Sequence, residues 1–106
     1  MASLEEFQKL DLRIGKVLAA TTHEHADRLL VLTVDVGTEQ RQLVAGIRAS
    51  YQPEQLIGRS VVLVANLDPA TIRGVESQGM ILATQDDNGT VLLTTDRNVP
   101  PGSRVK

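Results

Sequence analysis

The chain has 106 residues, the size of one domain, and its 42% hydrophobic and 23% charged residues exclude a disordered chain. It has no cysteine, which excludes disulfides, thiol catalysis and cysteine-ligated zinc. Its net charge is −2 and its only Phe and Tyr residues are Phe7 and Tyr51, so it is not strongly basic and a site of stacked aromatic rings is excluded.

The first predicted element is a short N-terminal helix over residues 4–9. Ser3 and Glu6 have the spacing of a capping box, in which each side chain binds the other residue's backbone N–H. Leu4 and Phe7 follow at helical spacing, which gives the helix one apolar face.

The next segment has the pattern of a strand with an irregularity. Leu12 and Ile14 alternate as in a strand, and after Gly15 the apolar residues shift by one position to Val17 and Ala19. A one-residue shift at a glycine predicts a β-bulge, here at Gly15. Bulges increase the twist of a strand and help a sheet to curl.

Two further strands are predicted to form a hairpin. Apolar residues alternate along residues 29–36, and the positions that share one face are Leu30, Leu32, Val34 and Val36. The turn sequence Gly37-Thr38-Glu39 then leads into a strand over residues 40–45.

The second half of the chain starts with a short helix over residues 53–57, which has Pro53 near its start and Gly58 after its end. The apolar run from Ser60 to Leu67 predicts a strand buried on both sides. The remaining elements are a loop over 68–79, a strand over 80–84, a hairpin turn at Asp87-Asn88-Gly89, a strand over 91–94 and a last short strand over 103–106.

Five strands with a helix between the third and fourth favour an all-β fold, the five-stranded Greek-key barrel of the OB-fold. From the pattern alone, a generic small barrel or a sandwich stays open. We expect residues 1–106 to form one such domain. No apolar run approaches the ~18 residues of a membrane span and no signal-peptide layout is present, which predicts a cytoplasmic chain without a membrane partner.

The sequence offers little support for catalysis or metal binding. His23 and His25 would share one face of a strand, as a two-histidine metal site requires, but a polar loop between two strands is the favoured interpretation. There is no nucleophile elbow and no glycine-rich nucleotide loop, so we expect a chain that is not an enzyme and has no cofactor or metal.

The segment from Ala65 to Met80 holds two amides, a guanidinium, hydroxyls and a thioether around two glycines. Such a loop can present many hydrogen-bond donors to a polyanion. Alternatively, Arg73 and Glu76 pair on the surface and the glycines only turn the chain. The residues by themselves leave both interpretations open.

Six motifs occur in order along almost the whole chain. They are Asp11-Leu12-Arg13-Ile14-Gly15-Lys16-Val17, His23-x-x-Ala26-Asp27-Arg28-Leu29, Val34-Asp35-Val36-Gly37, Arg41-Gln42-Leu43-Val44-Ala45-Gly46-Ile47, Val64-Ala65-Asn66-Leu67 and Arg73-Gly74-x-x-Ser77-x-Gly79-Met80. Together they resemble the tRNA-binding domain family. That family includes the C-terminal domain of bacterial methionyl-tRNA synthetase, free-standing structure-specific tRNA-binding proteins and the EMAP-like domain.

The resemblance implies an OB-fold that binds tRNA by shape and forms homodimers through its N- and C-terminal extensions. Leu4, Phe7 and the tail after Pro101 are then expected in or beside the dimer interface. The family positions and the loop chemistry give these candidate RNA contacts: Arg28, Arg48, Asn66, Arg73, Ser77, Gln78 and Met80.

Two departures from the family pattern bear on RNA affinity. Asp68 and Thr71 stand where members often carry lysine, and Glu24 stands where members often carry proline after histidine. These residues lower the positive charge near the expected site, so binding is expected to depend more on Arg48, Arg41 and the basic C-terminal tail.

We therefore expect a non-catalytic, structure-specific tRNA-binding module that acts as a homodimer. It would be free-standing or the C-terminal domain of methionyl-tRNA synthetase, with tRNA and an aminoacyl-tRNA synthetase as partners. The scarcity of aromatic rings fits a protein that reads folded RNA through phosphates and 2′-hydroxyls. The alternative is a dimeric OB-fold chaperone, related to secretion, that binds peptides.

Overall fold

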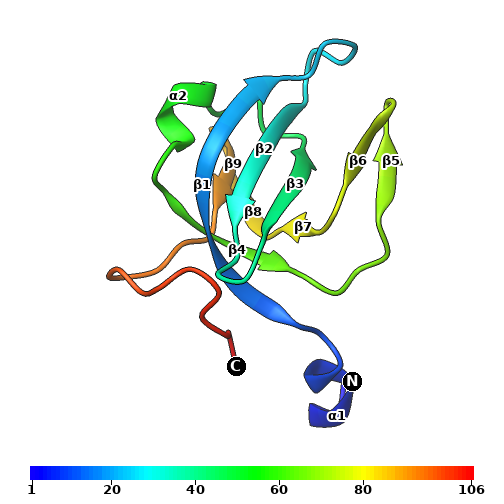
Figure 1. The fold of residues 1–106 in the computed structure, drawn as a ribbon, viewed down its shortest axis with the longest axis vertical. Helices are drawn as coiled ribbons and strands as arrows, with labels where there is room; N and C mark the ends of the chain where they lie inside the picture. The colour runs from blue at the N-terminus through cyan, green and yellow to red at the C-terminus, as the bar shows by residue number, and fades with distance from the viewer.

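Five antiparallel strands form a sheet that is almost closed into a barrel in the computed structural model, which describes residues 1–106 (Figure 1). The strands are β1 (Leu12–Thr22), β2 (Leu30–Asp35), β3 (Gln40–Ala45), β4 (Ser60–Val64) and β7 (Met80–Ile81), in the order β3-β2-β1-β4-β7. The short helix α2 (Pro53–Leu56) connects β3 to β4. The prediction of an all-β, OB-like barrel with a helix between its third and fourth strands is confirmed.

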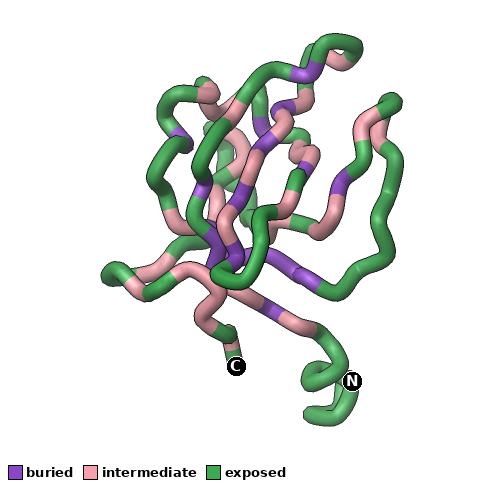
Figure 2. The backbone as a smooth tube through the Cα atoms, in the orientation of Figure 1, coloured by how far each residue is buried: buried purple, intermediate pink, exposed green.

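The barrel interior is aliphatic, as the composition requires. Along β2 every second residue is fully buried, namely Leu30, Leu32 and Val34. β4 is buried on both faces from Val61 to Val64, as its continuous apolar run predicts. Figure 2 shows the buried residues gathered on these central strands, while the loops and the N-terminal helix are exposed.

Side-chain hydrogen bonds complete the barrel between β3 and the segment that precedes β7. Ser77 Oγ accepts a hydrogen bond from the Val44 N–H (2.9 Å), and Gln78 Oε1 accepts one from the Gln42 N–H (2.9 Å). The Gln78 N–H in turn donates to the Gln42 carbonyl (2.8 Å). These contacts join β3, at one edge of the sheet, to the segment that leads into β7 at the other edge.

The bulge predicted at Gly15 lies elsewhere. The pairing of β1 with β2 shifts register between Val17 and Ala19, whereas Gly15 pairs regularly with Val61 of β4. Gly15 serves close packing instead, because a Cβ there would lie 2.4 Å from Val34 Cγ1. The shift in the apolar pattern correctly predicts a bulge in this strand. The bulge is at Val17–Ala19, however, and Gly15 is needed for packing against Val34.

The predicted loop over residues 68–79 contains a β-hairpin, formed by β5 (Ala70–Ile72) and β6 (Val75–Ser77). The strand predicted over 60–67 ends at Val64, and the strand predicted over 80–84 is divided into β7 and β8 (Ala83–Asp86). β8 pairs with β9 (Gly89–Leu92) through the predicted turn. The last predicted strand is only a single bridge between Arg13 and Arg104.

The N-terminal helix α1 (Leu4–Gln8) projects from the barrel (Figure 1). Its capping box is present: Ser3 Oγ accepts from the Glu6 N–H (3.2 Å), and Glu6 Oε1 accepts from the Ser3 N–H (3.0 Å). None of its residues is buried. No helix of the structure has the length and apolar character needed to cross a membrane.

Candidate nucleic-acid interface

Three connecting segments meet at one end of the barrel, and each carries an exposed arginine. Arg28 lies in the β1–β2 loop, Arg48 in the turn after β3, and Arg73 at the tip of the β5–β6 hairpin. The Arg48 N–H donates to the Arg28 carbonyl (3.3 Å), and the Arg73 guanidinium donates to the His25 carbonyl (3.4 Å). These bonds bring three of the seven predicted contacts to one end of the molecule.

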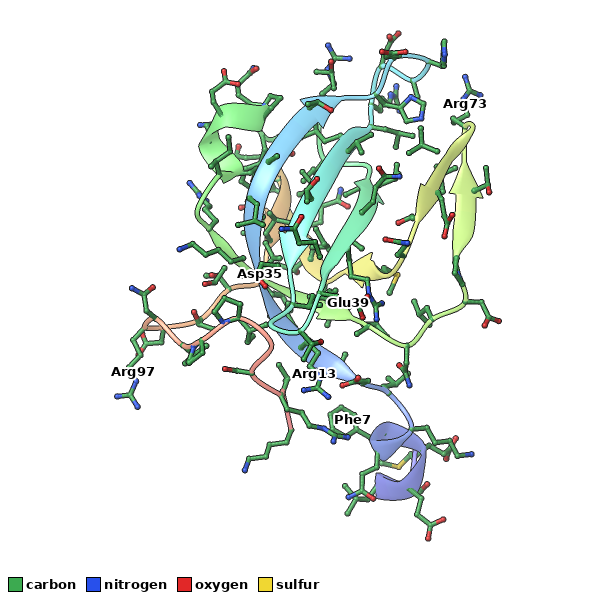
Figure 3. All side chains as sticks on the ribbon, viewed as in Figure 1. Phe7, Arg13, Asp35, Glu39, Arg73 and Arg97 are labelled. Atoms are coloured by element: carbon green, nitrogen blue, oxygen red, sulfur yellow. The ribbon has the colours of Figure 1, made fainter.

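Arg73 has an unusual backbone conformation. Its φ is +53° and that of Gly74 is +89°, so both central residues of the hairpin turn have positive φ, as in a type I′ turn. Glycine, asparagine or aspartate usually occupies the first of these positions. Figure 3 shows the Arg73 side chain at the outer tip of the hairpin, beside the β1–β2 loop. The turn therefore holds a long cationic side chain away from the barrel surface.

His23 organises this end of the barrel. It is only 4% exposed, its Nδ1 accepts from the His25 N–H (3.0 Å), and its Nε2 lies 3.2 Å from the Ile72 carbonyl. Since a carbonyl can only accept, Nε2 is the donor of this hydrogen bond. Both nitrogens are engaged within the chain, so His23 joins the β1–β2 loop to the β5–β6 hairpin.

The arginines at this end have no carboxylate partner. The two ion pairs of the structure lie elsewhere, at Arg13–Asp11 (2.6 Å) and Arg41–Glu39 (3.1 Å). Arg73 does not pair with Glu76, so the surface-pairing alternative for the hairpin is wrong. Unpaired guanidinium groups are well suited to bind phosphate, because the fork of N–H donors matches its oxygens.

Three other predicted contacts make hydrogen bonds within the chain. Asn66 Oδ1 accepts from the Asp11 N–H (2.8 Å), while its amide donates to the Lys9 carbonyl (2.7 Å). Ser77 and Gln78 are used in barrel closure, as described above. Their polar side chains hold backbone segments together, which is why they do not lie free in the loop.

Met80 and the three residues that depart from the family pattern are all exposed. Met80 is exposed on β7, which lies near the base of the β5–β6 hairpin, away from its tip (Figure 1). Asp68 and Thr71 are exposed before and within β5, and Glu24 is exposed in the β1–β2 loop. Arg41, expected to assist binding, donates instead to the carbonyls of Ala65 (2.7 Å) and Gln78 (3.0 Å).

A second surface feature is the N-terminal helix, which exposes apolar side chains. Leu4 is 70% and Phe7 41% exposed. A groove of about 300 Å³ separates the helix from the C-terminal tail and is lined by Phe7, Gln8, Leu10, Arg104, Val105 and Lys106. The two chain ends therefore form one partly apolar surface, and Figure 3 shows its Phe7 at the other end of the molecule from Arg73.

The sequence is similar to those of known proteins. The family model described as "Putative tRNA binding domain" matches residues 12–104. The chain is 52% identical over 104 residues to a methionine–tRNA ligase of Thermococcus kodakarensis, which covers 98% of this chain and 14% of that protein. The chain thus spans only about a seventh of the length of the curated relatives it matches.

The fold is similar to solved structures of the same size. A MetRS related protein from Pyrococcus horikoshii has a TM-score of 0.92 and 36% identity, with 100% of this chain and 98% of that chain covered. The chaperone CsaA from Bacillus anthracis str. Ames has a TM-score of 0.91 and 33% identity, with 100% and 99% covered.

Proposed function

Because this chain belongs to the tRNA-binding domain family, we propose that it is a non-catalytic module that binds tRNA by the shape of the folded RNA. The family model covers every strand of the barrel. The chain is a binding domain and not the catalytic part of an enzyme. The three unpaired arginines at one end of the barrel are the observation on which the proposal rests.

The chemistry of this end supports contact with phosphates rather than base reading along a single strand. Arg28, Arg48 and Arg73 are exposed on three segments fixed to one another, so they can meet phosphates of different parts of a folded RNA. The chain has no Trp and only one Phe and one Tyr. Proteins that grip single strands without sequence preference rely on several such rings.

The module is proposed to act as a homodimer. A helix of five residues without a single buried side chain gains little from its own chain, and isolated helices of this length are unstable in water. Burial of Leu4 and Phe7 against a second copy, together with the tail after Pro101, would stabilise it. Two copies would also double the number of phosphate contacts available to one RNA.

The full context of the module follows from its relatives. Methionine–tRNA ligases match this chain over only about a seventh of their length, so the chain corresponds to a small part of such an enzyme. We propose that the chain is either that part of a synthetase or a free-standing protein that supplies tRNA to a synthetase. Its place of action would then be the cytoplasm.

A second candidate function has its own support. The chaperone CsaA from Bacillus anthracis matches the whole chain at 33% identity, and the groove beside α1 has partly apolar walls. A peptide-binding chaperone would use this apolar surface and not the arginines. The substitution Arg73→Ala discriminates the two functions, because it should weaken RNA binding and leave peptide binding unchanged.

The direct test is a titration of the chain with intact tRNA and with an unstructured RNA of equal length, at several salt concentrations. We expect several-fold tighter binding of tRNA, and weaker binding of both RNAs as salt rises. Arg97→Ala is the matched control, since Arg97 is exposed on the opposite side of the barrel from Arg73 (Figure 3). Equal affinity for the two RNAs, or no binding at low salt, would refute the proposal.

A further inference from the structure

The largest pocket of the structure lies at the end of the barrel that carries Arg73, and its lining includes His23 and His25. It has a volume of about 530 Å³ and lies between the end of β1, the β1–β2 loop, β2 and β6. This volume is within the range of about 300–1,000 Å³ that is typical of small-molecule sites. The residues that define its chemistry are Thr21, Thr22, Glu24, His25, Val31 and Val75.

The pocket has apolar side chains from two different strands. Val31 belongs to β2, whose neighbouring residues Leu30 and Leu32 are buried in the barrel, so alternation directs Val31 to the outer face. Val75 comes from β6 in the hairpin that covers this face. The two valines form an apolar surface between the sheet and the hairpin.

The other lining residues are polar and can form hydrogen bonds. Thr21 and Thr22 contribute hydroxyl groups, Glu24 a carboxylate and His25 an exposed ring. His23, which also lines the pocket, ties the β1–β2 loop to the hairpin, because its two ring nitrogens bind the His25 backbone and the Ile72 carbonyl. The pocket is therefore held in shape before any ligand arrives.

We propose that this pocket accepts one unpaired nucleobase of the bound RNA. The inference rests on the proposed function and adds a base contact to it. A flat, partly apolar ring with polar edges matches apolar walls and a polar rim. The imidazole of His25 offers a stacking surface, which histidine provides in RNA sites much as phenylalanine and tyrosine do.

The charges around the pocket favour a base inside it and a phosphate outside it. Glu24 makes the pocket itself unfavourable for phosphate, since like charges repel. The Arg73 guanidinium reaches the carbonyl of His25 at the pocket edge, where the phosphate of an inserted nucleotide would lie. An inserted base thus explains both an acidic residue and an arginine at neighbouring positions.

The Glu24 carboxylate also predicts a base preference. A carboxylate only accepts hydrogen bonds, so it favours bases with an exocyclic amino group, which are adenine, cytosine and guanine. Uracil has a carbonyl oxygen where cytosine has its amino group, so its N3–H is the only donor that its base edge offers to the carboxylate. Glu24, which lowers the positive charge of the site, would therefore provide selectivity.

The experiment follows the chain by NMR while AMP, CMP, GMP, UMP or ribose 5-phosphate is added. We expect chemical-shift changes at Val31 and Val75 with the three amino-bearing nucleotides, weaker changes with UMP and none with ribose 5-phosphate. Equal changes with ribose 5-phosphate would identify a phosphate site. The absence of changes at Val31 and Val75 with every nucleotide would likewise overturn the proposal.

Two exposed residues of the same loop form a matched pair of variants. Glu24→Gln and Asp27→Asn remove the same charge, but only Glu24 lines the pocket. Both should bind tRNA more tightly at low salt, and only Glu24→Gln should lose the preference against UMP. Loss of that preference in both variants, or in neither, contradicts the role of Glu24.

His25→Ala tests the base contact within tRNA. The affinity for tRNA should fall at least about fivefold, the lower end of what a stacked base contributes. If tRNA binds this variant as tightly as it binds the unchanged protein, the proposal that the pocket accepts a base is wrong, while the proposed tRNA-binding function stands. If tRNA does not bind the unchanged protein at all, the proposed function itself fails.

Discussion

Ser77 is a predicted RNA contact, and in the structure its side chain helps to close the barrel. Replacing Ser77 by alanine distinguishes these two roles. Ser77 is 4% exposed, and its hydroxyl oxygen accepts from the Val44 N–H at 2.9 Å. The same hydroxyl donates to the Gly79 carbonyl at 3.1 Å. Alanine fits the same space but removes the hydrogen bond to Val44 of β3 and the hydrogen bond to Gly79 within the segment before β7.

The expected loss of stability follows from the groups left behind. The Val44 N–H loses its partner beneath the hairpin, and an unsatisfied buried donor costs about 1–3 kcal/mol. For a domain of this size each kcal/mol lowers the unfolding midpoint by about 4–8 °C. A loss near 2 kcal/mol therefore corresponds to a decrease of roughly 8–16 °C.

The assay is thermal unfolding of Ser77→Ala beside Thr71→Ala, a substitution of an exposed hydroxyl in the same hairpin. The control should change stability by no more than about 0.5 kcal/mol, as surface substitutions usually do. Affinity for tRNA is then measured below both midpoints, where each variant is folded, and should be unchanged. A Ser77→Ala variant with normal stability and reduced tRNA affinity would refute the reasoning.

Three further predictions concern packing, assembly and the N-terminal segment. Gly15→Ala should lower the free energy of unfolding in urea by about 1–3 kcal/mol, because its Cβ would lie 2.4 Å from Val34 Cγ1; a change within error would contradict this packing. The double substitution Leu4→Asp/Phe7→Asp should convert a dimer to a monomer in sedimentation, and a wild-type chain that is already monomeric at micromolar concentration would contradict the assembly. Asn66→Ala should cost about 1 kcal/mol and speed amide exchange near Asp11, whose N–H it binds at 2.8 Å; reduced tRNA affinity without that loss would instead make Asn66 an RNA contact.

Long periodic elements of the fold were predictable from the sequence. Alternation along β2 and the unbroken apolar run of β4 identified both strands and their buried residues. The β5–β6 hairpin was not predicted, because three-residue strands are too short to show a period. Its turn sequence, Arg73-Gly74, was the available signal, since glycine at the second turn position is common in two-residue hairpins.

The candidate site was predictable in part, for a physical reason. Arginines in loops stay exposed because their charge is costly to bury, so the exposure of Arg28, Arg48 and Arg73 was predictable, while their contact with RNA stays a prediction. Serine and asparagine form hydrogen bonds equally well with RNA and with backbone groups. Only the three-dimensional contacts show that Ser77 and Asn66 bind the chain itself. The sequence likewise does not indicate that His23 is buried or that both of its ring nitrogens form hydrogen bonds.

The salt dependence of tRNA affinity tests the central claim most directly. Each arginine that binds a phosphate contributes roughly 0.7–0.9 to the slope of log affinity against log salt. Replacing Arg28, Arg48 and Arg73 together by alanine should therefore weaken binding and reduce this slope by roughly 2–3, whereas Arg97→Ala should leave it unchanged. An unchanged slope and affinity in the triple variant would show that tRNA binds elsewhere on the chain.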